Sequence, residues 1–250
     1  MIHKIKILDD VNHQNVIKFF GTSRNHETGN FMIILQYANN GNLRDHLKKK
    51  QIEGIYKISC AEVFRIAKQI VSGLKYLHDK NIIHRDLHSK NILIIDDDKV
   101  LIADFGIAKS LNDSSTLSSR IAGMSPYIDC QCIKHIKGAP DKESDIYSLG
   151  VLFWELTSGV PPFNKLPMAA AIIEISKGRR EETVENTPPD YADLYKNCWS
   201  SHSAERPTLE YSLSVLEKLS KEIIDEIITN NVEHDYLYNG PNTSKGTIKL

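Results

Sequence analysis

The residues best suited to chemistry lie in the first half of the chain, at Asp86, Asn91 and Asp104. Asp86 ends a His-Arg-Asp tripeptide and Asp104 begins Asp-Phe-Gly. Transfer of a γ-phosphoryl group needs a carboxylate that orients the substrate hydroxyl and accepts its proton, and hard oxygen ligands for the Mg²⁺ that offsets phosphate charge. The three residues supply those groups in the required order. An isolated Asp-Phe-Gly would more often be a turn, but its occurrence with the other two motifs at this spacing makes that interpretation negligible.

The elements around these residues are predicted to hold them on loops. Ser59 and Glu62 form a Ser-x-x-Glu capping box ahead of a broad apolar stripe that reaches Leu77, which predicts a long amphipathic helix. After it, residues 92–95 and 100–102 read as two short strands around an acidic turn. The catalytic motifs therefore lie between rigid neighbours.

The remaining elements follow from hydrophobic periodicity and from proline breaks. The predicted helices are 2–11, 145–157, 168–177, 191–198 and 209–228, and the predicted strands are 16–21 and 31–37, joined as a hairpin by the polar segment 23–30. After about Asn230 the sequence becomes polar and loses periodicity, which predicts a flexible tail. The second half of the chain should be mostly α-helical.

Composition and charge narrow the class of protein. The 250 residues are 41% hydrophobic and 25% charged with a net charge of −1, which is ordinary for one globular unit and leaves no field to attract nucleic acid or an anionic membrane. The four cysteines are irregularly spaced, which favours reduced structural thiols over a zinc site. No apolar stretch approaches the ~20 residues of a membrane span, and no signal peptide is recognisable. We expect a cytoplasmic location, with the nucleus as an alternative, and neither nucleic acid nor membrane as a partner.

The combination of His-Arg-Asp, Asn and Asp-Phe-Gly resembles the eukaryotic protein kinase family, from about Ile5 to Leu219. The resemblance implies that Asp86 is the catalytic base and that Asn91 and Asp104 hold Mg²⁺. Arg85 and Lys90 of the same loop complete the implied catalytic set. It also implies ATP as the phosphoryl donor and a protein as the substrate.

The same resemblance assigns an adenine site. The segment Leu35-Gln36-Tyr37-Ala38 is similar to a gatekeeper residue followed by the hinge. Backbone groups of Gln36 and Ala38 would bond the adenine, and Leu93 would be its apolar floor. Leu35 and Leu93 could equally be plain core residues, which they also are in the family.

The implied fold class is α+β, with a mainly α large lobe at 39–228, a partial β small lobe at 1–38 and a tail at 229–250. The partial lobe would hold the end of helix αC, a His13-x-Asn15 turn, and strands 4 and 5. Asp145 would anchor the backbone of the catalytic loop. An apolar column would link the lobes through Leu8, Phe19, Phe105 and His84.

The resemblance is greatest to the tyrosine-kinase-like branch, on Cys198-Trp199 and Arg206-Pro207-Thr208. Serine/threonine kinases usually have a lysine where this chain has His88, so the substrate residue stays open between serine/threonine and tyrosine. The segment from Gly123 to Tyr127 favours serine/threonine, although Met124 replaces a threonine. A serine-rich segment from Ser114 to Ser119 is either a soluble loop or a site of regulatory phosphorylation.

The chain also departs from the family in residues that bear on phosphate binding and on the Arg206 contact. No glycine-rich loop or strand-3 lysine is recognisable, and Lys4 stands where a glutamate would pair with that lysine. Gln131 replaces the glutamate expected to bond Arg206, and should bond it more weakly. These departures imply impaired transfer by a kinase with a truncated small lobe, or alternatively a pseudokinase-type scaffold. Because strands 4 and 5 alone leave an exposed sheet edge, we expect upstream sequence or a partner chain to complete the sheet.

Overall fold

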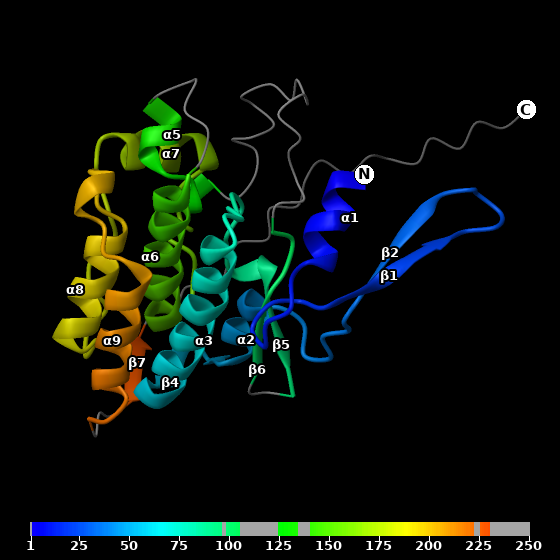
Figure 1. Ribbon diagram of the computed structural model, residues 1–250. Coiled ribbons are helices and arrows are strands. Elements are labelled where there is room, and N and C mark those ends of the chain that lie inside the picture. Colours follow the sequence, from blue (N-terminus) through cyan, green and yellow to red (C-terminus); the bar gives the residue numbers. More distant parts are fainter. Residues whose placement is uncertain (1, 97–98, 106–124, 135–140, 223–225, 231–250) are drawn as a thin grey trace, which may run out of the picture.

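The computed structural model describes residues 2–96, 99–105, 125–134, 141–222 and 226–230. A layer of helices forms one side of the molecule, small sheets lie beside it, and the hairpin of β1 and β2 projects away (Figure 1). The α+β class predicted from the sequence is confirmed.

Four helices make the main core. They are α3 (Cys60–Asp79), α6 (Lys142–Ser158), α8 (Pro189–Cys198) and α9 (Leu209–Leu219), and α3 packs on α9 while α6 packs on α8. α3 buries one apolar stripe, whereas α6 is buried on nearly all sides. A helix that is buried on nearly all sides belongs in the centre of a core, and α6 contacts α3 as well as α8, whereas α9 packs on α3 and α8.

Shorter helices complete the helical part. They are α1 (Ile2–Asp9), α2 (Leu43–Lys49), α5 (Cys130–Lys134) and α7 (Met168–Ser176), with 3-10 turns η1 (Ser89–Asn91), η2 (Ser125–Tyr127) and η3 (Ser203–Glu205). Two of these helices, α1 and α7, match the predicted ranges 2–11 and 168–177.

The cap of α3 differs from the predicted one in a single contact. The Ser59 side chain accepts a hydrogen bond from the Glu62 amide, as expected. The Glu62 carboxylate, however, accepts from His46 Nε2 at 2.9 Å and from Lys50 Nζ at 2.8 Å. It therefore ties α2 to α3, a role that local spacing did not reveal.

Two antiparallel pairs flank the region of the catalytic motifs. β1 (Phe19–Arg24) pairs with β2 (Phe31–Leu35), and β5 (Ile92–Ile95) pairs with β6 (Lys99–Ile102). The predicted strand 16–21 starts too early, because Val16 forms a parallel bridge with Ile102 instead of joining the hairpin. Through that bridge the segment after α1 continues the β5–β6 sheet.

A third sheet corrects the prediction for the end of the chain. The predicted helix 209–228 is wrong beyond Leu219, because β7 (Glu226–Asn230) pairs antiparallel with β4 (Ile55–Ser59), which in turn pairs with β3 (Gln51–Ile52). β7 also crosses the predicted boundary between lobe and tail at 228/229. Its backbone groups find partners on the edge of a hairpin far away in the sequence, which helical periodicity cannot indicate. Residues 231–250 of the predicted tail lie outside the described residues.

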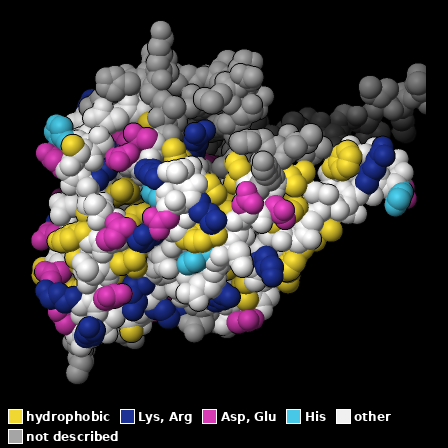
Figure 2. Space-filling model, in the orientation of Figure 1, with side chains coloured by type: hydrophobic (Ala, Val, Ile, Leu, Met, Phe, Trp, Pro, Cys, Tyr) yellow, Lys and Arg dark blue, Asp and Glu magenta, His cyan; other side chains and the backbone are white. Residues whose placement is uncertain are grey.

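The projecting hairpin carries exposed apolar side chains. Phe20 and Phe31 are 61% and 59% exposed, and Met32 and Ile34 are both 46% exposed. Figure 2 shows hydrophobic side chains along this arm of the molecule. Within the described residues the hairpin is a two-stranded sheet, which agrees with the predicted exposed edge.

Gly159, which ends α6, should tolerate no side chain. Its φ is +75°, and a Cβ there would lie 2.5 Å from Cδ2 of Tyr56, whose hydroxyl donates to Leu156 O. We expect Gly159→Ala to lower the free energy of unfolding by about 2–4 kcal/mol, from left-handed strain plus overpacking, as measured by urea denaturation.

The matched control is Gly178→Ala. Gly178 has a φ of +88° but open space around its Cα, so only the strain of about 1 kcal/mol applies. Equal decreases in the free energy of unfolding of the two variants would contradict the predicted clash with Tyr56.

Candidate active site

Asp145 organises the backbone of the loop that carries the His-Arg-Asp motif. It lies in the first turn of α6, is 1% exposed, and accepts hydrogen bonds from the amides of His84 and Arg85, each at 2.8 Å. His78 Nε2 lies 2.8 Å from the same carboxylate. Arg85 is thereby held at φ +68°, in the left-handed region. The predicted contact between Asp145 and the catalytic loop is present.

Asp86 follows this anchored pair with an accessible side chain. Its carboxylate is 41% exposed, and its amide donates to His84 Nδ1 at 3.2 Å. Asn91 lies across the loop, and its Nδ2 donates to the backbone oxygen of Asp86 at 2.9 Å. The loop is therefore closed at both ends while the carboxylate of Asp86 remains free to meet a substrate.

The same loop is bonded to the strand that leads to Asp104. Ala103 N donates to Asn91 O at 2.9 Å, and His84 Nε2 lies 2.9 Å from Ala103 O. Burial lowers the pKa of His84, with Asp145 acting in the opposite direction, so the ring is neutral and its Nε2–H can donate to Ala103 O. Asp104 itself is exposed at φ +59°, whereas Phe105 is fully buried.

Asn91 and Asp104 fit a magnesium ion that also binds phosphate and water. Because the Asn91 amide nitrogen is occupied by Asp86 O, its Oδ1 is the atom left for a cation. Asp104 offers a carboxylate exposed to solvent. Mg²⁺ commonly takes one or two protein oxygens and completes its octahedron with substrate phosphates and water, so two ligands suffice.

The predicted adenine site lies where β2 ends. Leu35 is partly buried at that end, and the amide of Gln36 donates to the backbone oxygen of Lys18, just before β1, at 2.8 Å. Farther along, Asn42 forms an antiparallel bridge with Leu93 of β5. The chain after Ala38, the predicted hinge residue, thus runs beside β5, the strand that carries the predicted floor Leu93.

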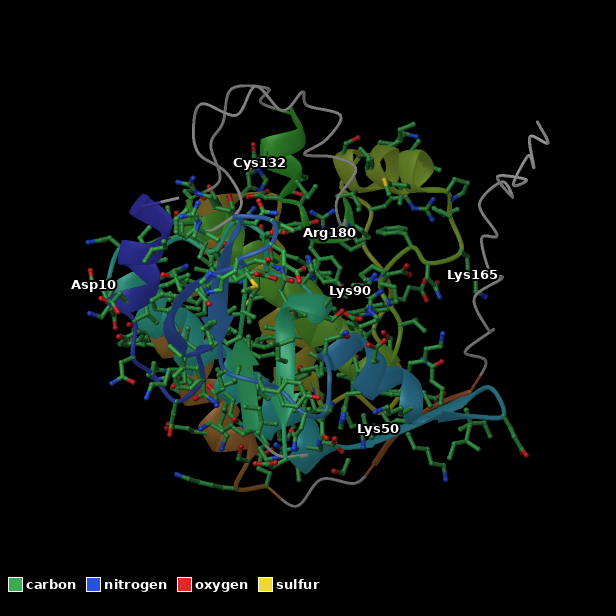
Figure 3. All side chains as sticks on the ribbon, turned by 90° about the vertical axis from the view of Figure 1, so that its right-hand side faces the viewer. Asp10, Lys50, Lys90, Cys132, Lys165 and Arg180 are labelled. Carbon is green, nitrogen blue, oxygen red and sulfur yellow. The ribbon has the colours of Figure 1, made fainter. Side chains whose placement is uncertain are left out.

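Arg85 and Lys90, the other predicted catalytic residues, are both exposed. Lys90 belongs to η1, next to the buried Asn91. In Figure 3 it lies between α2, which ends near Lys50, and the segments that carry Cys132 and Arg180.

Comparison with known proteins identifies the family of this chain. The family described as "Protein tyrosine and serine/threonine kinase" matches residues 1–216. This chain belongs to the protein kinase family. The predicted kinase fold and the resemblance to the tyrosine-kinase-like branch are confirmed.

Individual relatives are similar at about 30% identity. The serine/threonine-protein kinase STY46 of Arabidopsis thaliana is 30% identical over 224 residues, covering 89% of this chain and 37% of that protein. The serine/threonine/tyrosine-protein kinase HT1 of the same plant is 32% identical over 220 residues, covering 86% and 53%. The tyrosine-protein kinase Abl of Drosophila melanogaster is 29% identical over 246 residues, covering 97% and 14%. The chain spans only about a third to a half of the two plant relatives.

Several expected kinase features can be located, and others cannot. Leu8, Phe105 and His84 of the predicted column are buried and Phe19 is partly buried. The side chain of Lys4 lies outside the described part, as do Gly106, the serine-rich segment and Met124. No helix in the described part of this kinase is both long and apolar enough to cross a membrane.

A buried polar cluster behind the kinase loop was not predicted. Glu155 of α6 is fully buried and accepts hydrogen bonds from Arg44 Nε, from Ser89 Oγ at 2.9 Å and from Tyr127 Oη. Arg44 Nη2 also donates to Tyr127 Oη at 2.7 Å. The one signal in the sequence is an acid inside the apolar run 151–156, because a buried carboxylate requires partners.

The prediction that Gln131 bonds Arg206 is wrong. Arg206 makes a bidentate pair with Asp129, at 2.7 and 3.0 Å, and both side chains are almost completely buried. The Gln131 side chain bonds a different residue, because its Nε2 donates to the backbone oxygen of Ser201 at 2.6 Å. Asp129, two residues before Gln131, therefore takes the place of the expected glutamate. The contact with Arg206 is thus still an ion pair.

Asp129→Asn should strongly destabilise the kinase. It leaves a buried guanidinium without its counter-ion, which costs about 3–5 kcal/mol, measurable as the free energy of unfolding in urea. The control is Asp190→Asn, which breaks an exposed pair with Lys218 and should cost about 1 kcal/mol or less. A larger loss from Gln131→Ala than from Asp129→Asn would contradict the assignment.

Proposed function

We propose that the protein containing this chain transfers the γ-phosphoryl group of ATP to serine or threonine residues of other proteins. The observation that carries the proposal is the exposed Asp86 carboxylate on a loop closed by Asp145 on one side and by Asn91 on the other. A general base must be accessible to the substrate and still fixed in position, and this arrangement supplies both.

In the proposed reaction, the oxygen of a substrate hydroxyl forms a bond to the γ-phosphorus. The bond from that phosphorus to the β–γ bridging oxygen breaks, and ADP leaves with the electron pair. Asp86 orients the hydroxyl and receives its proton. When bound at Asn91 and Asp104, Mg²⁺ neutralises phosphate charge. Arg85 and Lys90 add positive charge beside the loop.

Binding of the nucleotide is assigned to the hinge. We propose that the Gln36 carbonyl and the Ala38 amide bond the adenine edge, with Leu35 behind the base and Leu93 below it. The adjacency of the hinge and β5 through the Asn42–Leu93 bridge supports this assignment.

The preference for serine/threonine rests on the relatives and on the sequence around Tyr127. STY46 and STY17 carry names of serine/threonine kinases, although HT1 and Abl bear names that include tyrosine. We propose proteins as the substrates, and a cytoplasmic location with the nucleus as the alternative.

Made on its own, this 250-residue polypeptide should transfer phosphate slowly. No glycine-rich phosphate loop or strand-3 lysine is recognisable in it, and removing one electrostatic interaction with a transition state lowers the rate ~10²–10³-fold. The same observation favours a second candidate function, a pseudokinase-type module that binds partners without transferring phosphate.

Three variants test the proposal. The polypeptide should be stabilised by about 5–10 °C with Mg²⁺–ATP at a hundred times its Kd, and EDTA should remove most of that shift. Asp104→Asn should reduce the rise in melting temperature that Mg²⁺–ATP causes. Asp86→Asn should keep that rise while lowering the rate of phosphate transfer to a serine/threonine peptide library ~10²–10⁴-fold. The control, Asp193→Asn on α8, should change neither measurement.

The outcomes separate the two candidate functions. A thermal shift without transfer in the polypeptide would support the scaffold. Transfer that survives in Asp86→Asn would remove Asp86 from the role of base.

We also propose that a β-strand of a partner chain pairs with the exposed edge of the β1–β2 hairpin. The exposed Phe20 and Phe31 support this, because a two-stranded ribbon is marginal in water. Exchange of the backbone amide protons of β1 should slow when a polypeptide that contains the pairing strand is added. Slow exchange in a monodisperse monomer of the 250-residue chain would contradict it.

A further inference from the structure

His88 lies on the catalytic loop, two residues after Asp86, and takes no part in the reaction proposed above. It is only 8% exposed, and its Nε2 lies 3.8 Å from Asp86 Oδ1. Its backbone oxygen accepts from the amide of Asn91 at 2.9 Å, so the residue is fixed at its base by the loop itself. The ring is therefore directed at the exposed carboxylate.

Tyr127, in the 3-10 turn η2, packs against the His88 ring. The two rings meet edge to face, with centroids 6.0 Å apart and an interplanar angle of 60°. The Tyr127 hydroxyl is in turn bonded to Glu155 and Arg44. Because these groups are buried, the imidazole has little freedom to rotate away from Asp86.

The surroundings of the two ring nitrogens assign the tautomer. Nδ1 is buried and has no hydrogen-bond partner among the described residues, whereas Nε2 faces a carboxylate. A proton on Nδ1 would bury an unpaired donor, at a cost of about 1–3 kcal/mol, so the proton belongs on Nε2. The ring therefore presents its Nε2–H to the Asp86 carboxylate.

We infer that His88 is a positioning residue for Asp86, with Nε2–H held toward the carboxylate so that its other oxygen is aimed at the substrate hydroxyl. This inference rests on the proposed transfer reaction. The distance of 3.8 Å is longer than a hydrogen bond, and such contacts commonly tighten when substrate binds.

A spectroscopic test is independent of activity. With ¹⁵N-labelled histidine, NMR should give Nε2 of His88 the shift of a protonated nitrogen and Nδ1 that of an unprotonated one, at pH 7. His88→Gln identifies the signals by their loss. Asp86→Ala should move the Nε2 signal, and Asp193→Ala should not. A protonated Nδ1, or an Nε2 signal indifferent to Asp86→Ala, overturns the inference.

Kinetics of matched variants test the consequence for transfer. Glutamine can place an N–H at the position of Nε2, asparagine can place one only at Nδ1, and leucine has none. We expect kcat to fall about 10- to 100-fold in His88→Asn and His88→Leu and to stay within about threefold in His88→Gln, with KM for ATP unchanged. The exposed His202, changed to asparagine, is the control. Equal losses in the glutamine and asparagine variants, or no loss in the leucine variant, overturn the inference.

Failure of the proposed function can be recognised separately. If the wild-type chain binds Mg²⁺–ATP but transfers no phosphate, the proposed kinase activity fails for this polypeptide. The nitrogen shifts then decide by themselves whether Nε2 of His88 faces Asp86.

Discussion

The candidate site depends on the hydrogen bonds that the buried carboxylate of Asp145 accepts from the loop backbone. Asp145 lies in the first turn of α6, where the helix dipole favours a negative charge, and it accepts from two consecutive backbone amides and one histidine. Those hydrogen bonds compensate for the burial of the charge and hold Arg85 in a left-handed conformation. Asp86 can therefore be exposed and still occupy one position, because the residues before it are fixed to the core helix.

The core helix carries a second buried acid at its other end. Glu155 joins α2, the catalytic loop and the segment of Tyr127 through Arg44, Ser89 and Tyr127. The pair of Asp129 and Arg206 fastens the start of α5 to the loop before α9. Removing a single partner from such a group costs much more than the pair itself contributes, because a buried charge is left uncompensated. The segments of Tyr127 and Asp129 are thus held to the core by a few buried charges.

Patterns within one element were predicted well. The amphipathic stripe of α3 and its Ser59 cap, the β5–β6 hairpin and most helices follow from the spacing of apolar residues and breaks, which are local properties. Errors occurred where a segment finds its partner far away. The end of the predicted helix 209–228 is strand β7, because β4 offers it an edge, and Val16 joins Ile102 instead of β1. Gln131 was expected to bond Arg206, but Asp129 reaches it instead.

The sequence by itself determined the family and the chemical groups of the candidate site, since the motifs around Asp86, Asn91 and Asp104 keep their residue types and spacing. It also located the helices whose faces are apolar. Only the tertiary structure decided which charges meet in the interior: Asp145 with the loop amides, Glu155 with Arg44, and Asp129 with Arg206. It also decided that His88 faces Asp86 from a buried position. The physical reason is that a buried polar group must find partners wherever the fold brings them, and those partners are distant in sequence.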